Sequence, residues 1–122
     1  MSDTDKTKSF LLVDDRAEFV AIMAERLRQR GYRVAVATNG RSALEAMREQ
    51  RFDGVVLDLI MPGMDGIETL THLKELDPGV RVIVLTGHAS SQYVVQALAL
   101  GAADFMVKPV DIESLLARLL EG

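Results

Sequence analysis

Short apolar runs alternate along the chain with longer amphipathic segments. The apolar runs cover residues 10–13, 34–36, 55–57, 80–85 and 105–107. Several are apolar at successive positions rather than at every second one, which is typical of strands that are covered on both faces. The distance between neighbouring runs leaves room for a helix, so the pattern predicts five strand–helix repeats.

The amphipathic segments have the period of a helix and carry helix end signals. The first has a single apolar stripe and is followed by Gly31, which suits the left-handed conformation that ends many helices. One later segment spans 93–100, and the other three follow N-cap residues, namely Asn39, Asp65 and Asp111. Right-handed crossovers between the repeats imply an α/β fold with an open, mostly parallel sheet between helices.

Length and composition narrow the class of protein. At 122 residues the chain has room for one ordinary domain, which we place at 10–122, with the polar residues 1–9 as a flexible N-terminal arm. The absence of cysteine excludes disulfides, cysteine-ligated zinc and thiol nucleophiles. A net charge of −4 argues against nucleic-acid binding within this segment. Neither a membrane span nor a secretory signal is evident, so we expect a cytoplasmic protein without a membrane partner.

Residues with chemical potential follow four of the five predicted strands. Asp14 and Asp15 end the first strand, Asp58 the third, Thr86 the fourth and Lys108 the fifth. Ligands of open parallel sheets bind beyond the carboxyl ends of the strands. We therefore expect these side chains to meet at one edge of the sheet.

Three carboxylates at one edge need a compensating charge. Two unit charges about 5 Å apart repel by roughly 3 kcal/mol at an effective dielectric constant near 20. A divalent cation removes this repulsion, and ligands that offer only oxygen favour Mg²⁺, or Mn²⁺ in its place, over zinc. With Lys108 to bind an anion and Thr86 to donate a hydrogen bond, the set matches the needs of phosphoryl transfer, in which a carboxylate can itself be the nucleophile.

Four segments resemble a known family. In order, residues 10–15, 56–66, 84–87 and 101–109 read FLLVDD, VLDLIMPGMDG, VLTG and GAADFMVKP. Together they resemble receiver domains of two-component response regulators, of the chemotaxis regulator type, from about residue 10 to the end of the chain. The resemblance implies a flavodoxin-like (βα)5 sandwich with the parallel strand order 2-1-3-4-5.

The resemblance also implies roles for the site residues. Asp58 would accept a phosphoryl group from a phosphohistidine on a sensor histidine kinase or phosphotransfer protein. Asp15, Asp58 and the backbone carbonyl of Ile60 would ligate Mg²⁺, and Asp14 would act largely through bound water. Lys108 would pair with the phosphoryl oxygens. Such a protein is a switch rather than an enzyme, because it catalyses only its own phosphorylation and slow dephosphorylation.

Two further residues would transmit the signal. Thr86 would move toward the phosphoryl group, and Phe105 would then rotate inward. This would alter the face formed by the fourth helix, the fifth strand and the fifth helix, where we expect an output domain, a partner or a second copy to bind. The resemblance further implies a cis peptide between Lys108 and Pro109.

Three positions flank the expected phosphoryl group, namely Ile60, Gly87 and His88. Ile60 and His88 depart from well-known members of the family. Because Ile60 offers no hydrogen bond to an attacking water molecule, we hypothesise slow self-dephosphorylation. Phe105 stands where many members have tyrosine, so the switch would lack that hydroxyl group.

Other interpretations of the same residues remain open. Taken singly, the Asp14–Asp15 pair is typical of an N-cap, Asp58 of a turn, and Thr86 and Lys108 of ordinary strand ends. A magnesium-dependent phosphatase also forms an aspartyl phosphate, but usually has a second aspartate where this chain has Ile60. A flavin carrier of similar topology would need a first loop rich in hydroxyl groups and glycine. The sequence is compatible with a stand-alone receiver and with the amino-terminal receiver of a longer regulator.

Overall fold

Ten elements alternate strictly between strand and helix. The computed structural model describes residues 8–61, 65–87 and 92–121. In chain order the elements are β1 (Ser9–Val13), α2 (Ala17–Gln29), β2 (Arg33–Ala37), α3 (Gly40–Glu49), β3 (Gly54–Asp58), α4 (Gly66–Leu76), β4 (Arg81–Thr86), α5 (Gln92–Ala99), β5 (Asp104–Val107) and α6 (Ile112–Leu120). The five predicted strand–helix repeats are confirmed.

The strands form one parallel sheet with the order β2-β1-β3-β4-β5. The register pairs Val13 of β1 with Leu57 of β3, so these two strands end side by side. Both the parallel sheet expected from the sequence pattern and the strand order implied by the resemblance are confirmed.

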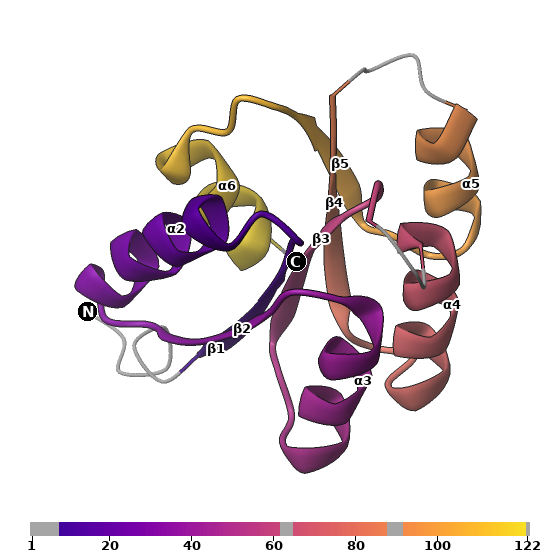
Figure 1. The fold of residues 1–122 in the computed structure, drawn as a ribbon, viewed down its shortest axis with the longest axis horizontal. Coiled ribbons are helices and arrows are strands. Elements are labelled where there is room, and N and C mark those ends of the chain that lie inside the picture. Colours follow the sequence, from indigo (N-terminus) through magenta and orange to yellow (C-terminus); the bar gives the residue numbers. More distant parts are fainter. Residues whose placement is uncertain (1–7, 62–64, 88–91, 122) are drawn as a thin grey trace.

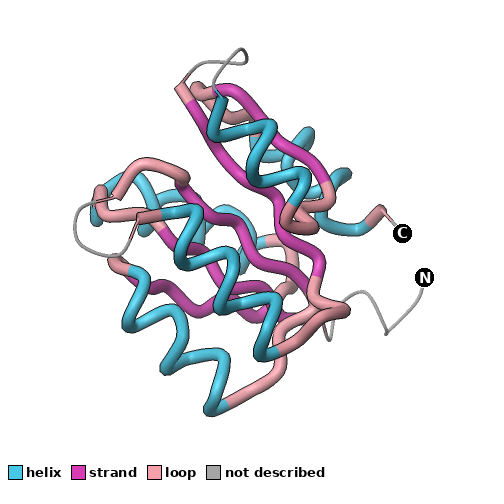
Figure 2. The backbone as a smooth tube through the Cα atoms, turned by 90° about the vertical axis from the view of Figure 1, so that its right-hand side faces the viewer, coloured by secondary structure: helices cyan, strands magenta, loops and turns pink. Residues whose placement is uncertain are grey.

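Helices cover both faces of the sheet (Figures 1 and 2). Alternate residues of the central strands point to opposite sides, because successive side chains of a strand do so. Leu11 and Leu57 belong to a core beneath α3, α4 and α5, whereas Leu12 and Val56 belong to a second core beneath α2 and α6. Successive apolar residues in β1, β3 and β4 are therefore explained by burial on both faces.

Local signals position the helix ends as predicted. The side chains of Asn39, Asp65 and Asp111 accept hydrogen bonds from the backbone N–H groups of Ser42, Glu68 and Ser114, at 2.8, 2.8 and 3.0 Å. Gly31, directly after α2, has the left-handed φ of 95°. The Lys108–Pro109 peptide is cis, as the resemblance implied.

The first strand begins one residue before the predicted domain boundary. Ser9 pairs with Arg33 in the sheet, and its backbone N–H donates to the Asp53 carboxylate at 2.8 Å. Residues 1–7 of the expected N-terminal arm lie outside the described residues. No helix in the described part of the chain combines the length and hydrophobicity that a bilayer crossing requires.

Candidate functional site

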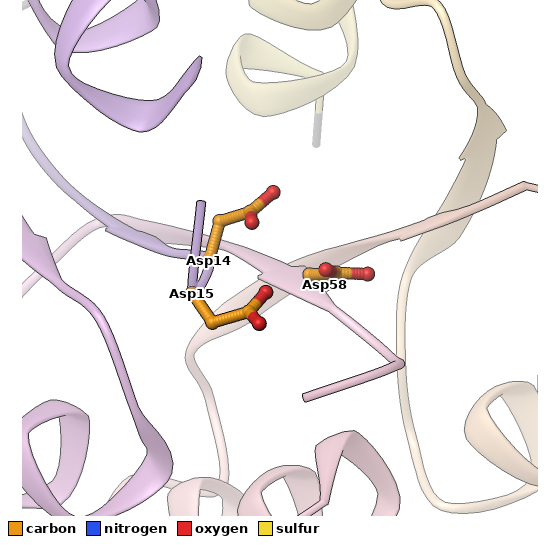
Figure 3. Close-up of side chains that lie close together, drawn as sticks. All are labelled: Asp14, Asp15 and Asp58. Carbon is orange, nitrogen blue, oxygen red and sulfur yellow. The ribbon is translucent and has the colours of Figure 1, made fainter. Parts of the chain in front are cut away.

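Three carboxylates converge at the carboxyl ends of two adjacent strands (Figure 3). Asp14 and Asp15 follow β1, and Asp58 is the last residue of β3. Because Val13 of β1 pairs with Leu57 of β3, the residues that follow β1 lie beside the last residue of β3. One carboxylate oxygen from each of the three residues lies within 4.8 Å of the others. The predicted acidic cluster is present.

The three carboxylates differ in their exposure to solvent. Asp14 and Asp58 are only 2% and 4% exposed, whereas Asp15 is exposed. Asp14 is held by its backbone N–H, which donates to the carbonyl of Ala37 in β2 at 3.1 Å. The site therefore consists of two buried carboxylates, Asp14 and Asp58, and one carboxylate, Asp15, that is exposed to solvent.

Lys108 reaches the cluster from the edge of the sheet. It follows β5, which is separated from β3 by β4. Its backbone N–H donates to the carbonyl of Thr86 at 2.9 Å, and its Nζ lies 3.3 Å from Asp58 Oδ2 and 3.5 Å from Asp14 Oδ2. The ammonium group thus bridges the two buried carboxylates.

Burial dominates the electrostatics of Asp58. Loss of solvent raises the pKa of the Asp58 carboxyl above its ordinary value, and the negative charge of Asp14 raises it further. The N–H of Ile60, which donates to Asp58 Oδ1 at 3.2 Å, and the Lys108 ammonium lower the pKa but do not offset the burial. The surroundings of Asp58 therefore disfavour its charged form.

The donor set fits a hard divalent cation. All three carboxylate ligands are oxygen donors, and cysteine, the preferred soft ligand, is absent from the chain. A cation beside Asp58 would also relieve the repulsion that raises the pKa of this residue. The site can thus hold a metal ion such as Mg²⁺, Mn²⁺ or Ca²⁺.

Of the remaining predicted residues, Ile60 follows Asp58 by two positions, Thr86 and Gly87 lie at the end of β4, and Phe105 lies in β5. Thr86 ends β4 and is 4% exposed, and a side chain at Gly87 would meet no atom within 4 Å. Ile60 is 61% exposed. Phe105 is half-buried and packs against the core beneath α3, α4 and α5. His88 lies outside the described residues.

Sequence reasoning assigned no site role to Arg16 and Phe19. The Arg16 backbone N–H donates to Asp14 Oδ1 at 2.9 Å, and its Nε lies 3.6 Å from the same oxygen. The Arg16 guanidinium and the Lys108 ammonium lie 4.5 and 5.5 Å from the centroid of the Phe19 ring. Phe19 was assigned only to the apolar stripe of the first helix, and no local pattern distinguishes it from the other stripe residues.

The N-cap interpretation of the Asp14–Asp15 pair is wrong. The N-cap of α2 is Arg16, and no side chain caps it. The turn interpretation of Asp58 holds in part, because this carboxylate accepts the Ile60 N–H. Asp58 therefore shapes its loop while remaining part of the cluster.

Comparison with known proteins supports one family. The model of the response regulator receiver domain matches residues 10–120. The transcriptional regulatory protein ZraR of Escherichia coli is 45% identical over 109 residues, which are 89% of this chain and 25% of ZraR. PrrA of Mycobacterium tuberculosis is 39% identical over 89% of this chain and 47% of its own length. The chain thus spans about a quarter of ZraR and about half of PrrA.

Solved structures of similar fold carry related ligands. A response regulator from Burkholderia pseudomallei, with a phosphorylated aspartic acid, a calcium ion and citrate, superposes with a TM-score of 0.86 at 38% identity over 92% of this chain and 66% of that one. A chain of the CheX–CheY–BeF3–Mg²⁺ complex from Borrelia burgdorferi gives a TM-score of 0.85 at 32% identity over 93% of this chain and 87% of that one.

Proposed function

This chain belongs to the response regulator receiver domain family, and from that premise we propose that it is a phosphorylation-controlled switch with Asp58 as the phosphoacceptor. The observation that carries the proposal is the convergence of Asp14, Asp15 and Asp58 with the Lys108 ammonium at 3.3 Å from Asp58. Family membership favours such a switch over the magnesium-dependent phosphatase and the flavin carrier that the sequence left open.

The proposed reaction moves a phosphoryl group from histidine to aspartate. An oxygen of the ionised Asp58 carboxylate attacks the phosphorus of a phosphohistidine on a sensor histidine kinase or phosphotransfer protein. The phosphorus–nitrogen bond breaks with its electron pair passing to the imidazole, and an acyl phosphate forms on Asp58. Lys108 lies where it can pair with the phosphoryl oxygens, and Thr86 can donate to them.

Asp15, Asp58 and the backbone carbonyl of Ile60 would hold the metal ion, with Asp14 acting through a bound water molecule. Mg²⁺ is proposed because the ligands are hard oxygens, and Mn²⁺ should substitute for it. When bound, the ion neutralises the negative charge that accumulates between the carboxylates and the phosphoryl group. The chain itself supplies the nucleophile, the ammonium group and the hydroxyl group.

Phosphorylation would act through the charge that it adds. A phosphoryl group brings a charge of about −1.5 to −2. We propose that Lys108 and Thr86 capture it and that Phe105 repacks in response, which changes the face of α5, β5 and α6. Exposed apolar side chains are present on these elements, including Tyr93 and Val95 of α5 and Val107 of β5. An output domain, a partner protein or a second copy of the chain would bind there.

Intact mass spectrometry tests the phosphoacceptor directly. Acetyl phosphate with Mg²⁺ should add one phosphoryl group to the wild type and none to Asp58→Asn, and chelation of the metal should abolish the gain. Asp53→Asn is the matched control, because Asp53 is exposed and lies before β3, at the opposite end of that strand. Equal phosphorylation of Asp58→Asn and the wild type would refute the assignment.

A further inference from the structure

The aromatic ring of Phe19 contacts both cations of the site. Arg16 Cζ lies 4.5 Å and Lys108 Nζ 5.5 Å from the ring centroid. Both distances are within the roughly 6 Å at which the negative face of an aromatic ring attracts a cation. Phe19 lies in the first turn of α2, three residues after Arg16, and packs against the core beneath α2 and α6. The ring is thus fixed to the protein interior and faces the charged site.

Three attractions converge on the Lys108 ammonium. It lies 3.3 Å from Asp58 Oδ2, 3.5 Å from Asp14 Oδ2 and 5.5 Å from the Phe19 centroid. A lysine side chain has four rotatable carbon–carbon bonds, and its ammonium group is a strongly hydrated point charge. Two carboxylates can hold such a group in several arrangements. An additional attraction to the Phe19 ring reduces the number of positions that the ammonium group can take.

Arg16 contacts both the Phe19 ring and the Asp14 carboxylate. Its backbone N–H and Nε both approach Asp14 Oδ1, whereas Lys108 approaches Asp14 Oδ2. One carboxylate is therefore bracketed by two cations, each of which contacts Phe19. The start of α2 thus contacts Asp14 through Arg16 and Lys108 through Phe19.

We propose that Phe19 is a positioning residue that holds the Lys108 ammonium between Asp14 and Asp58 through a cation–π interaction. This inference rests on the proposed function, in which Lys108 stabilises the charge that develops on the transferred phosphoryl group. A cation that is already in place before the reaction stabilises this charge without reorganisation. The ring acts on the reaction only through Lys108.

The variant Phe19→Leu distinguishes the cation–π interaction of Phe19 from its packing against the core. Leucine preserves an apolar side chain against the core beneath α2 and α6 but has no π face, whereas tyrosine and tryptophan preserve the face. Tyr32→Leu is the matched control. Tyr32 packs against the same core, with its ring tilted by 42° to that of Phe10 and 5.3 Å from it between centroids. It precedes β2 and so lies at the amino ends of the strands, away from the site.

Two measurements are needed on the full chain. The first is the rate of Asp58 phosphorylation by acetyl phosphate with Mg²⁺, in which the bond between phosphorus and the acetate oxygen breaks, acetate leaves and a phosphorus–oxygen bond to Asp58 forms. We expect Phe19→Leu to be slower by about two- to tenfold, and Phe19→Tyr, Phe19→Trp and Tyr32→Leu to stay within about twofold of the wild type. The second is the NMR shift of the Lys108 side-chain methylene protons, which the ring current should move upfield in every variant that keeps an aromatic ring at position 19.

Each outcome decides the proposal. The proposal would be overturned if Phe19→Leu were phosphorylated at the wild-type rate, or if Phe19→Tyr were as slow as Phe19→Leu. It would also be overturned if the NMR shifts of the Lys108 side chain were equal in the wild type and Phe19→Leu. If the wild type itself takes up no phosphate, the proposed function fails, and the Lys108 shifts alone then decide whether Phe19 positions the ammonium group. Phe19→Met replaces the leucine variant if the latter does not fold.

Discussion

Asp58 combines two demands that conflict at the level of a single residue. A nucleophilic carboxylate must be ionised, yet Asp58 is 4% exposed and close to the carboxylate of Asp14. Its raised pKa shows that the folded state disfavours the charge on which the proposed reaction depends. The proposed reactivity would thus come at the expense of stability, as is common where charged groups are held for chemistry.

Asp58→Asn should therefore stabilise the protein at neutral pH without metal. Because the pKa of Asp58 is higher in the folded state than its ordinary 3.8, the folded state binds more protons than the unfolded state between these two values. The free energy of unfolding of the wild type consequently falls as pH rises through this window, and it stays lowered above it. We expect the variant to have a Tm a few degrees higher at pH 7, with the difference shrinking as pH approaches 4.

Thermal unfolding by circular dichroism over this pH range provides the measurement. Asp53→Asn serves as the control for the loss of one negative charge at an exposed position, because the amide oxygen of asparagine can still accept the Ser9 backbone N–H. A variant that is less stable than the wild type at pH 7, or a difference that grows on acidification, would contradict the assignment of Asp58 as a strained buried carboxylate.

Ile60 should lengthen the lifetime of phosphorylated Asp58. Its side chain is 61% exposed next to the acceptor and offers no hydrogen bond to an attacking water molecule. Ile60→Asn introduces a donor and an acceptor, and we expect phosphate loss to be about fivefold faster, since one hydrogen bond is worth about 1 kcal/mol. The decay of the phosphorylated mass after removal of acetyl phosphate measures this. Faster decay in the wild type would refute the hypothesis.

At the scale of elements, side-chain caps fix where the helices begin. The Asn39 side chain accepts the backbone N–H of Ser42 at 2.8 Å and starts α3 directly after β2. Asn39→Ala should lower the free energy of unfolding by about 1 kcal/mol, because the N–H group at the helix start loses its partner. Asn39→Asp keeps an acceptor oxygen and should be close to the wild type in chemical denaturation. Equal losses in both variants would show that the cap contributes nothing.

The start of α4 is packed against the loop that follows Asp58. A Cβ atom at Gly66 would lie 2.4 Å from Leu59 Cα and 2.5 Å from the Leu59 carbonyl oxygen, so the backbone of this loop would have to move. Gly66→Ala should destabilise the protein by about 2–3 kcal/mol and impair phosphorylation. Gly79→Ala is the control, because its nearest contact would be at 3.7 Å, and it should change stability by less than about 0.5 kcal/mol. Similar stabilities for the two variants would contradict the close approach.

At the scale of the whole molecule, metal binding should couple to global stability. The proposed ligands follow β1, end β3 or lie in the loop after β3, so unfolding would disperse them and only the folded state would bind the ion tightly. Each tenfold increase of Mg²⁺ above its dissociation constant should add about 1.4 kcal/mol, or roughly 5 °C in Tm.

Asp15→Asn should weaken this stabilisation because it removes the exposed carboxylate ligand, while Asp53→Asn should keep it. Sodium chloride at matched ionic strength controls for general screening of the net negative charge. An Asp15→Asn variant that gains as much Tm from Mg²⁺ as the wild type would exclude Asp15 from the metal site.

The elements, and the edge of the sheet at which the candidate site lies, could be predicted because their signals are local or independent of strand order. Helix period and the caps at Asn39, Asp65 and Asp111 are read over a few residues. In a parallel sheet all carboxyl ends lie at one edge, so the pattern predicted that Asp14, Asp58 and Lys108 share that edge, whereas the distances between them depend on the strand order. The strand order came only from the resemblance to a family, because periodicity says nothing about which strands pair.

Which residues end each strand, and which chemistry they offer, could thus be read from the amino-acid sequence. How these residues are arranged depends on the folded chain. Asp14 and Asp15 are adjacent and chemically identical, yet one is buried and the other exposed, because the path of the chain after β1 turns their side chains differently. Lys108 spans β4 to reach Asp58, and Phe19 meets Lys108 across 89 positions of sequence only because α2 lies beside the loop after β5. Contacts of this kind depend on the distance between elements in space, which no local pattern encodes.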